Sequence, residues 1–569
     1  MKPSRNSIDV SAFGVTPSAS GDAAPGVRKA LARAISEGAS RLVFPKGTYH
    51  FHPDRAAEEH LYISNNDEGL HSIAMLIRGA AGLTIDGQGS RFVFHKDIVP
   101  IAVRASDDIT IAGIEIDWAQ TFTGEALIVG AGDGYADIEI PQRLNYRVEY
   151  GHLLFLDEAG APFKTGYSLE FDATARQPAS GVCDNFHMRT YVHAQEIGPR
   201  QVRLTAKYDA VPGIGNILIL QNEKRTSPAI TIGDSRNVEV SNVTVRHANG
   251  MALIAQRTHD IRVHNFTVSP SGGRMISSGG DATHFVNCKG LIEIDGCLAE
   301  NMMDDFTNVH GIYASIVQAT GDRQVDLRLM HRQQLGIDIT QFGDAVEFVR
   351  RDTMARYHVA LVTAAERINK SFTRLTLSEA LPKDIQAGDG LQSLGWQPDL
   401  TIRNCVLRKY RGRGCLITTA GKALVENNLF QTAGAAISIE GDVRNWYESG
   451  AVRDVLIRKN RFENCNYLGW GQPTIQVNPR IDPEHRAGTL YHKEIRVEDN
   501  RFETFHNSLV RAHCVDGFTF SGNEVHATSA YPPRADQAKV FEIEHSANVK
   551  IEGNRFDDAF RARWGRSCP

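Results

Sequence analysis

Cysteine is scarce in this chain, with 8 among 569 residues and no two of them in C-x-x-C spacing. That density is too low for a disulfide-scaffolded fold, and the missing C-x-x-C pairs argue against a structural zinc site. Several cysteines stand at apolar positions of a repeat described below, so we expect them to be buried free thiols.

Long hydrophobic runs and excess positive charge are missing too. No apolar run reaches the roughly 18 residues of a membrane-spanning helix. The net charge of -5, without clustered Lys and Arg, argues against nucleic-acid binding. Residues 1–15 lack the apolar core of a secretory signal, which fits a cytoplasmic start or a chain trimmed after signal cleavage. We expect no membrane span and no nucleic-acid partner.

A six-residue template recurs instead: a β-branched or aromatic residue, then a small, apolar or Asn residue three positions on, then an apolar residue. Its copies begin at residues 111, 240, 263, 294, 402, 425, 457, 497, 520 and 551. From residue 240 the intervals are 23, 31, 108, 23, 32, 40, 23 and 31. Periods in the twenties with Asn or Gly at the bends are typical of a right-handed parallel β-helix, and the LxxLxL consensus of leucine-rich repeats is missing. We predict an all-β protein of that fold.

The segment 26–38 has apolar residues at helical spacing and precedes a strand-like stretch. We predict an N-terminal helix that caps the first coil, because the end of a solenoid exposes apolar core and unpaired strand edges.

Two intervals, 111 to 240 and 294 to 402, are far longer than one coil, and both contain strand-like alternation. We predict that each holds a small inserted β-barrel module. The predicted organisation is a cap with the first coils at 1–117, module 1 at 118–228, central coils at 229–311, module 2 at 312–397 and C-terminal coils at 398–569. Module 2 is expected to overhang the acidic stretch that precedes it.

Three aspartates stand out in that stretch. Asp281 precedes the adjacent pair Asp304 and Asp305 by 23 positions, an interval of the repeat. Residues one coil apart lie about 4.8 Å apart, so Asp281 and Asp304 are expected to stack on one face. Crowded carboxylates raise one another's pKa, which supplies the acid and the base that glycoside hydrolysis needs. Turn capping by Asp and calcium binding are the alternatives at this point.

Four segments resemble glycoside hydrolase family 110: GDATHF (280–285), NCKG (287–290), MMDDFTNVHG (302–311) and EGDVRNWYESG (440–450). The resemblance implies a right-handed parallel β-helix with two inserted β-barrel modules. It implies an exo-acting, inverting α-galactosidase for terminal α-1,3-linked galactose, including that of the blood group B antigen. It further implies Asp304 as general acid, and Asp281 and Asp305 as the groups that position and deprotonate water. The hydrolysis requires no cofactor, and we predict no metal.

Residues 440–448 interrupt the repeat with aromatic and acidic side chains flanked by Gly, which suits a sugar-binding loop. The predicted substrate contacts are Glu440, Asn445, Trp446, Glu448, His310 and Arg274. The alternatives are that Trp446 packs on the flank of the solenoid and that His310 serves as a cap.

Other functions of the fold stay open. Polygalacturonases also carry DD and HG elements, but they need an Arg-x-Lys element for the uronate carboxylate, and none follows His310 on the coils. A calcium-dependent polysaccharide lyase and a non-catalytic glycan-binding β-helix are further alternatives. The expected partners are galactose-terminated glycans. The oligomeric state is open, with a homodimer as one option. Because bacteria commonly secrete such glycosidases, we expect a secreted or periplasmic protein, with a cytoplasmic location as the alternative.

Overall fold

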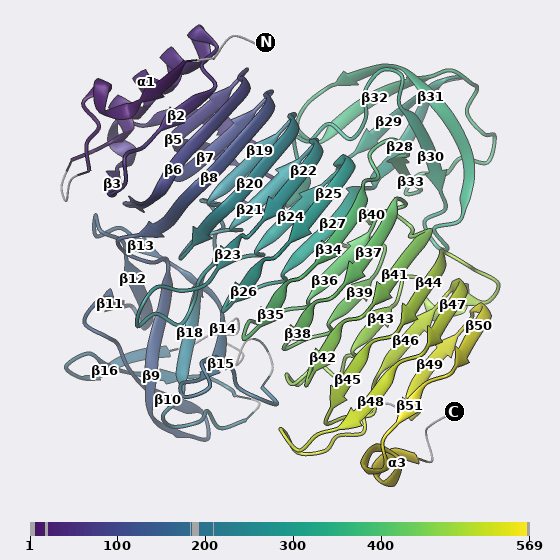
Figure 1. Ribbon diagram of the computed structural model, residues 1–569. Helices are drawn as coiled ribbons and strands as arrows, with labels where there is room; N and C mark the ends of the chain where they lie inside the picture. Colours follow the sequence, from purple (N-terminus) through teal and green to yellow (C-terminus); the bar gives the residue numbers. More distant parts are fainter. Residues whose placement is uncertain are drawn as a thin grey trace.

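The computed structural model describes residues 6–17, 21–182, 184, 193–208, 210–536 and 538–565. The chain winds into a stack of parallel β-coils, from the N-terminal end beside α1 to the C-terminal end beside α3 (Figure 1). One sheet of 22 strands runs the length of this stack, and a second long sheet runs beside it.

The template residues lie in register along the 22-stranded sheet. Val240 of β20 (Arg236–Val245) pairs with Ile111 of β8 (Asp107–Trp118) on one side and with Val263 of β22 (His259–His264) on the other. The same column continues through residues 294, 402, 425, 457, 497, 520 and 551. The predicted parallel β-helix is therefore confirmed, and the template marks one line of its core.

The second long sheet carries the site described below. Its strands are β4 (Ala57–Leu61), β5 (Gly69–Arg78), β7 (Val99–Arg104), β19 (Ile230–Gly233), β21 (Leu253–Gln256), β24 (Thr283–Val286), β27 (Thr307–Ile312), β36 (Cys415–Thr418), β39 (Ile437–Ile439), β43 (Ile475–Val477), β46 (Val510–His513) and β49 (Phe541–Glu544). Alternate side chains of a strand point to opposite faces. Phe285 and Val309 join the hydrophobic core, so His284, Asn308 and His310 face outward.

Helices close both ends of the stack. Helix α1 (Ala24–Glu37) packs Val27 and Leu31 into the main core and ends at Gly38, whose φ of 61° is the left-handed conformation that glycine adopts readily. Helix α3 (Asp558–Trp564) places Phe560 and Trp564 in the same core at the other end. The predicted N-terminal capping helix is confirmed, and each helix covers apolar surface that a terminal coil would expose to water.

Two antiparallel modules project from opposite sides of the stack (Figure 1). Module 1 has a seven-stranded sheet and a small three-stranded sheet. The seven strands are β9 (Thr123–Gly132), β10 (Tyr135–Glu139), β14 (Thr165–Asp172), β15 (Gln177–Pro178), β16 (His193–Gly198), β17 (Gln201–Thr205) and β18 (Ile217–Asn222), and the three are β11 (Asn145–Glu149), β12 (His152–Leu156) and β13 (Pro162–Phe163). Module 2 is a closed barrel of β28 (Ala314–Gly321), β29 (Gln324–Arg328), β30 (Ala345–Val349), β31 (Arg356–Arg367), β32 (Phe372–Leu377) and β33 (Gly390–Ser393).

The bends of the C-terminal coils are joined by a ladder of asparagines. Its members are the buried Asn428, Asn460, Asn500 and Asn523 and the half-buried Asn554. From Asn460 onward each side-chain oxygen accepts from the amide of the previous Asn, and each side-chain nitrogen in the ladder donates to a backbone carbonyl, as Asn500 does to Ile457. The ladder satisfies backbone groups that the bends would otherwise leave unpaired inside the protein.

Replacing Asn500 with Ala is expected to destabilise the protein by about 2 kcal/mol, because buried partners on both neighbouring coils lose their hydrogen bonds. Denaturant unfolding followed by circular dichroism measures the loss. Lys422→Ala, at an exposed position of the same C-terminal coils, should change stability by less than about 0.5 kcal/mol. Equal effects of the two substitutions would show that the ladder adds nothing.

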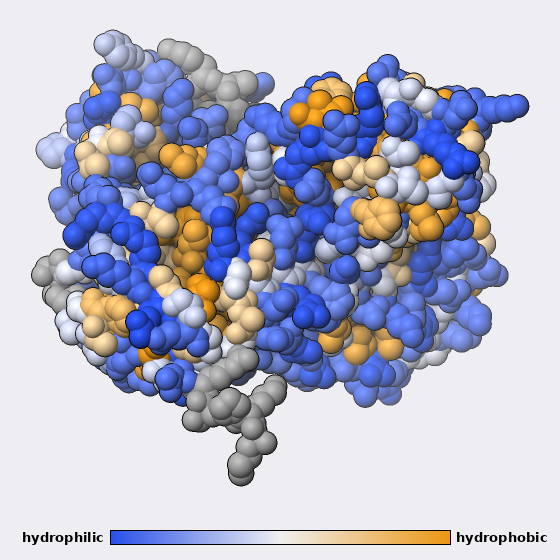
Figure 2. Space-filling view, turned by 90° about the horizontal axis from the view of Figure 1, so that it is seen from above, coloured by the Kyte–Doolittle hydropathy of each residue, from blue (hydrophilic) through white to orange (hydrophobic). Residues whose placement is uncertain are grey.

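The surface of the molecule is mainly polar. The face in Figure 2 is largely hydrophilic, with hydrophobic side chains in separate groups. Among the residues described, the helices are all too short or too polar to cross a lipid bilayer. The six described cysteines are free and buried, as expected from their repeat positions.

Candidate active site

The three aspartates meet at the bends that precede two neighbouring strands. Asp281 comes just before β24, and Asp304 and Asp305 come just before β27. Thr283 pairs with Thr307, so the local coil is 24 residues long rather than 23. Asp281 therefore aligns with Asp305, and the expectation that it stacks on Asp304 was wrong by one position. Asp304 nevertheless reaches the cluster, because the chain turns there and is not extended.

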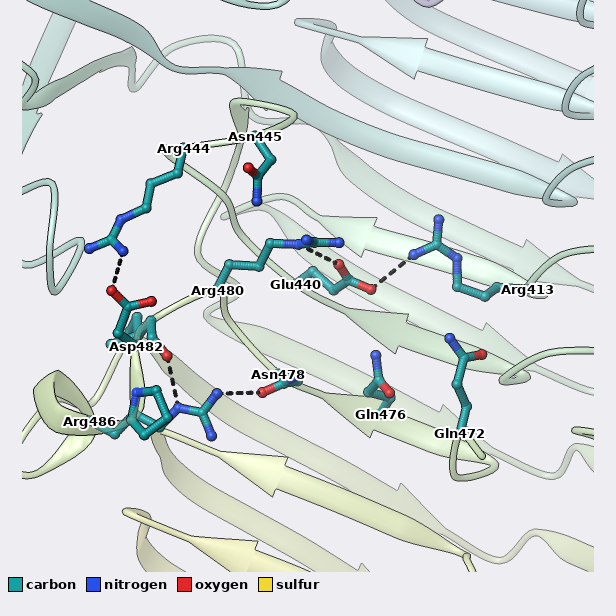
Figure 3. A pocket seen from close by; sticks show the side chains of 12 residues that line it. Arg413, Glu440, Arg444, Asn445, Gln472, Gln476, Asn478, Arg480, Asp482 and Arg486 are labelled. Carbon is teal, nitrogen blue, oxygen red and sulfur yellow. Dashed lines mark hydrogen bonds and ion pairs between the residues drawn. The ribbon is translucent and has the colours of Figure 1, made fainter. Parts of the chain in front are cut away.

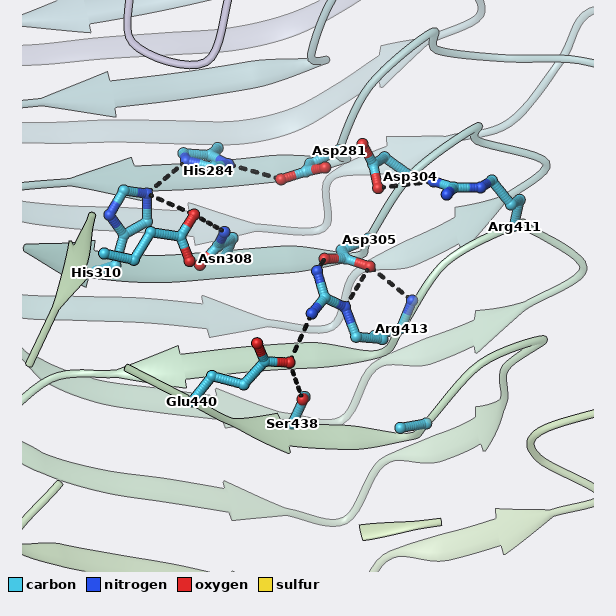
Figure 4. Close-up of polar contacts among 12 residues, drawn as sticks. Asp281, His284, Asp304, Asp305, Asn308, His310, Arg411, Arg413, Ser438 and Glu440 are labelled. Atoms are coloured by element: carbon cyan, nitrogen blue, oxygen red, sulfur yellow. Dashed lines mark hydrogen bonds and ion pairs between the residues drawn. The ribbon is translucent and has the colours of Figure 1, made fainter. Parts of the chain in front are cut away.

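Three arginines surround the acids. Arg225 and Arg411 both donate to Asp304, at 2.6 and 3.1 Å. Arg413 donates to Asp305 through its backbone nitrogen at 2.6 Å and through its guanidinium at 2.8 Å. Asp281 has no arginine within hydrogen-bonding distance among the described residues; its carboxylate lies 2.6 Å from His284 Nδ1. Figure 4 shows Arg411, Arg413 and His284 beside the three acids.

These contacts give the acids different proton affinities. Burial raises the pKa of Asp305 to about 7, against the lowering effect of Arg413. Burial and the charge of Asp304 hold the pKa of Asp281 well above its usual range. Burial acts on Asp304 as well, but Arg225 and Arg411 outweigh it and leave the pKa of that carboxyl below its usual value. One ionised carboxylate, Asp304, thus lies beside one carboxyl that keeps its proton, Asp281, and one that titrates near pH 7, Asp305.

The carboxylate oxygens lie within 4.8 Å of one another, close enough to hold a cation. The guanidinium groups of Arg225, Arg411 and Arg413 already lie beside the acids, and a divalent ion would be repelled by them. That the cluster binds no metal stays a prediction.

Glycine 412 lets the next coil approach the acids. Its φ is +119°, and a Cβ there would lie 2.6 Å from the carbonyl of Asp304. Because Arg411 and Arg413 flank this glycine, the close approach also brings both guanidinium groups to the carboxylates.

The loop 440–450 lies next to the acid cluster. Glu440 accepts from Arg413 at 2.9 Å, so one guanidinium bridges Asp305 and this loop. Glu440 and Asn445 line an open pocket of about 470 Å³, whose wall also carries Arg480 and polar amides (Figure 3). The pocket has the size and polar lining that suit a sugar.

The other predicted contacts are placed differently. Glu448 is buried, accepts from Asn308 at 3.2 Å and lies 3.6 Å from His310 Nε2. Trp446 is 42% exposed, and the centre of its ring lies 4.5 Å from that of His331. Among the predicted binding residues, Glu440, Asn445 and Trp446 are thus open to a ligand, while Glu448 and His310 lie behind them.

Arg274 does not join the acids. Its guanidinium donates to Asp117 at 2.6 Å and to the carbonyl of Trp118 at 2.7 Å. The adjacent amides of Met275 and Ile276 are held by Glu125 of module 1. These contacts hold the segment that leads into Asp281 in place, so the role of Arg274 is structural.

Both modules reach the site. Arg225 follows the last strand of module 1, and the Tyr167 hydroxyl on β14 donates to the carbonyl of Met303, beside the acid pair. Module 2 contacts the 440–450 loop through His331 and through Asp352, which pairs with Arg444. Sequence analysis expected module 2 to overhang the acids and did not single out Arg225, Arg411 or Arg413. The repeat spacing could have indicated one of these arginines. Two template copies are 108 residues apart, and the residue 108 positions after Asp305 is Arg413.

Comparisons with known proteins agree with this architecture. Three family models match: GLAA-B beta-barrel domain I over residues 124–218, GLAA-B beta-barrel domain II over 324–391, and a right-handed beta helix region over 391–564. The barrel assignments and the right-handed helix predicted from the sequence are thereby confirmed.

Curated relatives match along nearly the whole chain. Alpha-1,3-galactosidase A of Shewanella woodyi is 35% identical, over 96% of this chain and 90% of the relative. Alpha-1,3-galactosidase B of Bacteroides thetaiotaomicron is 32% identical, over 97% and 91%. A further alpha-1,3-galactosidase B, of Phocaeicola vulgatus, is 32% identical, over 97% and 95%. As its sequence motifs predict, the chain belongs to the α-1,3-galactosidase A and B family of glycoside hydrolases, family 110.

Proposed function

We propose that this protein removes terminal α-1,3-linked galactose from glycans, including the blood group B antigen and linear α-1,3-galactosides, by a single displacement that inverts the anomeric carbon. The observation that carries the proposal is the buried cluster of Asp281, Asp304 and Asp305, in which arginines separate the proton affinities. An inverting hydrolase needs one carboxyl to protonate the leaving oxygen and one carboxylate to activate water. The names of the relatives supply the linkage and the sugar.

Asp304 takes the acid role in this proposal. It is the most exposed of the three, with 21% of its side chain accessible against 5% for Asp281 and 4% for Asp305. In the substrate-free protein Asp304 is ionised, so it must first receive a proton. Asp305, whose pKa is about 7, has a carboxylate oxygen within 4.8 Å of one on Asp304 and can supply a proton as the sugar displaces water. Asp281 and Asp305 then act on the attacking water.

The pocket beside loop 440–450 supports exo action. It adjoins the acids through Arg413, and module 2 covers one edge of the loop through His331 and Asp352. In this proposal the glycan end enters between the loop and the acids and stops there, so that only the terminal residue is cleaved.

The test is proton NMR of the products from two glycans, the branched blood group B trisaccharide and linear α-1,3-galactobiose. We expect β-galactose as the first product, before mutarotation produces the α-anomer. Early α-galactose would contradict inversion. Release of products from polygalacturonate but from neither galactoside would favour a pectinase, and loss of activity with a chelator would favour a calcium-dependent lyase.

The native location of the activity is part of the proposal. We propose that the protein acts outside the cytoplasm, where the glycans of other organisms are met. Fractionation of the source cells with an antibody against this chain would check it, and a purely cytoplasmic signal would contradict it.

A further inference from the structure

Two buried histidines connect Asp281 with the interior of the site (Figure 4). His284 of β24 and His310 of β27 are each 1% exposed. His284 Nδ1 lies 2.6 Å from Asp281 Oδ2, and His284 Nε2 lies 3.0 Å from His310 Nε2. This series of hydrogen bonds ends at Gly311, whose carbonyl oxygen lies 2.7 Å from His310 Nδ1.

The hydrogen bond to the Gly311 carbonyl determines which atom carries the hydrogen in every other bond of the series. A carbonyl oxygen only accepts, so His310 Nδ1 carries hydrogen. Neutral His310 then accepts at Nε2, and the hydrogen of that bond belongs to His284 Nε2. Neutral His284 consequently accepts at Nδ1, which leaves Asp281 as the donor. In the resting protein Asp281 is therefore a protonated carboxyl whose hydrogen points at His284.

We infer that His284 and His310 form a proton relay that converts Asp281 from a protonated carboxyl into a base during the reaction. This inference rests on the proposed function and adds two positioning residues to it. In the relay step the Asp281 proton moves to His284 Nδ1, while the proton on His284 Nε2 moves to His310 Nε2. Asp281 becomes a carboxylate, His284 stays neutral in its other tautomer, and His310 becomes an imidazolium.

The protons are conserved over one catalytic cycle. Asp305 first gives its proton to Asp304, and Asp304 passes it to the leaving oxygen and is again a carboxylate. Asp281 takes a proton from the water whose oxygen attacks the sugar, and that proton passes from Asp281 to Asp305, which restores the donor. Asp281 is again a carboxylate, so the two relay protons return from His310 and His284 and the resting state is rebuilt.

The surroundings stabilise the His310 end of the relay. Glu448 Oε1 lies 3.6 Å from His310 Nε2, where its carboxylate faces the imidazolium. Burial raises the pKa of Glu448, against the lowering effects of His310, of Arg413 and of Asn308, which donates to the same oxygen.

The resting protonation agrees with the electrostatics of the pair. Burial lowers the pKa of His284 to about 3, with Asp304 and Arg225 acting in opposite directions. Burial also lowers the pKa of His310, against the raising effect of Glu448. Burial and Asp304 raise the pKa of Asp281. The ground state is thus two neutral imidazoles and one protonated carboxyl.

NMR of the protein labelled with ¹⁵N in histidine tests the resting state without any substrate. We expect hydrogen on Nδ1 of His310 and on Nε2 of His284 at neutral pH. Hydrogen on His284 Nδ1 in the free protein would overturn the inference. This readout does not depend on activity, so it separates a failure of the relay from a failure of the proposed galactosidase function.

The kinetic test is His310→Gln, which keeps a side chain able to accept from His284 but cannot take a proton. We expect kcat to fall about 100-fold at neutral pH with KM unchanged, and to recover at higher pH where Asp281 loses its proton to solvent. The control is His506→Gln, at another buried histidine, which donates to the Cys465 carbonyl far along the coils; its kcat should stay at the wild-type value.

An unchanged kcat and pH profile in His310→Gln would contradict the relay, and a raised KM with normal kcat would make His310 a substrate contact instead. If His310→Gln does not fold, Glu448→Gln serves in its place. Removing the charge beside His310 should also lower kcat at constant KM, and a wild-type kcat in that variant would count against the relay.

Discussion

Asp304→Asn is expected to lower kcat/KM on α-1,3-galactobiose by about 100- to 10,000-fold, the usual contribution of a positioned proton donor. The substitution keeps the size of the side chain and removes only its ability to carry the proton to the leaving oxygen. Nitrophenyl α-galactoside provides the sharper comparison, because nitrophenolate leaves without a proton. The variant should lose far less activity on that substrate than on the disaccharide.

The comparison of the two substrates also distinguishes the roles of Asp304 and Asp305. Asp305→Asn, if Asp305 acts on water, should lose similar activity on both substrates, because water must be activated whatever group leaves. The reverse pattern, with Asp305→Asn sparing the nitrophenyl substrate, would exchange the two roles. Asp184→Asn is the matched control: it releases Arg411 from its second carboxylate but leaves Asp304 intact. We expect a change below about tenfold there.

The path of the solenoid could be predicted from the sequence because its repeat is a local pattern. Each template copy places inward residues two positions apart, and the column from Ile111 to Ile551 is one continuous line of pairing. The inserted modules could be located only as gaps in that rhythm. Their internal topology depends on antiparallel pairings between distant strands, such as β9 with β18, which leave no periodic signature.

The acids of the site could be predicted, and their electrostatic partners mostly could not. Asp281, Asp304 and Asp305 share a spacing with the repeat, whereas Arg225 arrives from the end of a module with no fixed interval to them. Arg413 could have been predicted from the sequence, since it lies one coil beyond Asp305. The alignment error of one position at Asp281 has a related cause: coil lengths vary by single residues at the bends, and only the strand register shows which length applies.

The substitution Arg413→Met should have the largest effect on stability, a loss of about 3 kcal/mol at neutral pH. Removing one partner of a buried pair leaves the other charge without compensation, and Arg413 serves both Asp305 and Glu440. Denaturant unfolding measures the loss. Arg408→Met is the control, because Arg408 pairs with Glu300 at a more exposed position on the preceding strand, and it should lose no more than about 1 kcal/mol.

The pH dependence of that loss identifies its cause. Asp305 has a folded pKa of about 7, above its unfolded value, so its stabilising contribution is complete at low pH and lost as pH rises through about 7. Without Arg413, which lowers this pKa, the folded value rises further, and the variant continues to lose stability above pH 7 after the wild type has stopped. The gap between the two proteins should therefore widen from pH 7 upward and stay at its smaller value below pH 7. A gap that stays constant with pH would mean that Arg413 stabilises the coils by packing alone, and that the proton affinity of Asp305 is set elsewhere in the cluster.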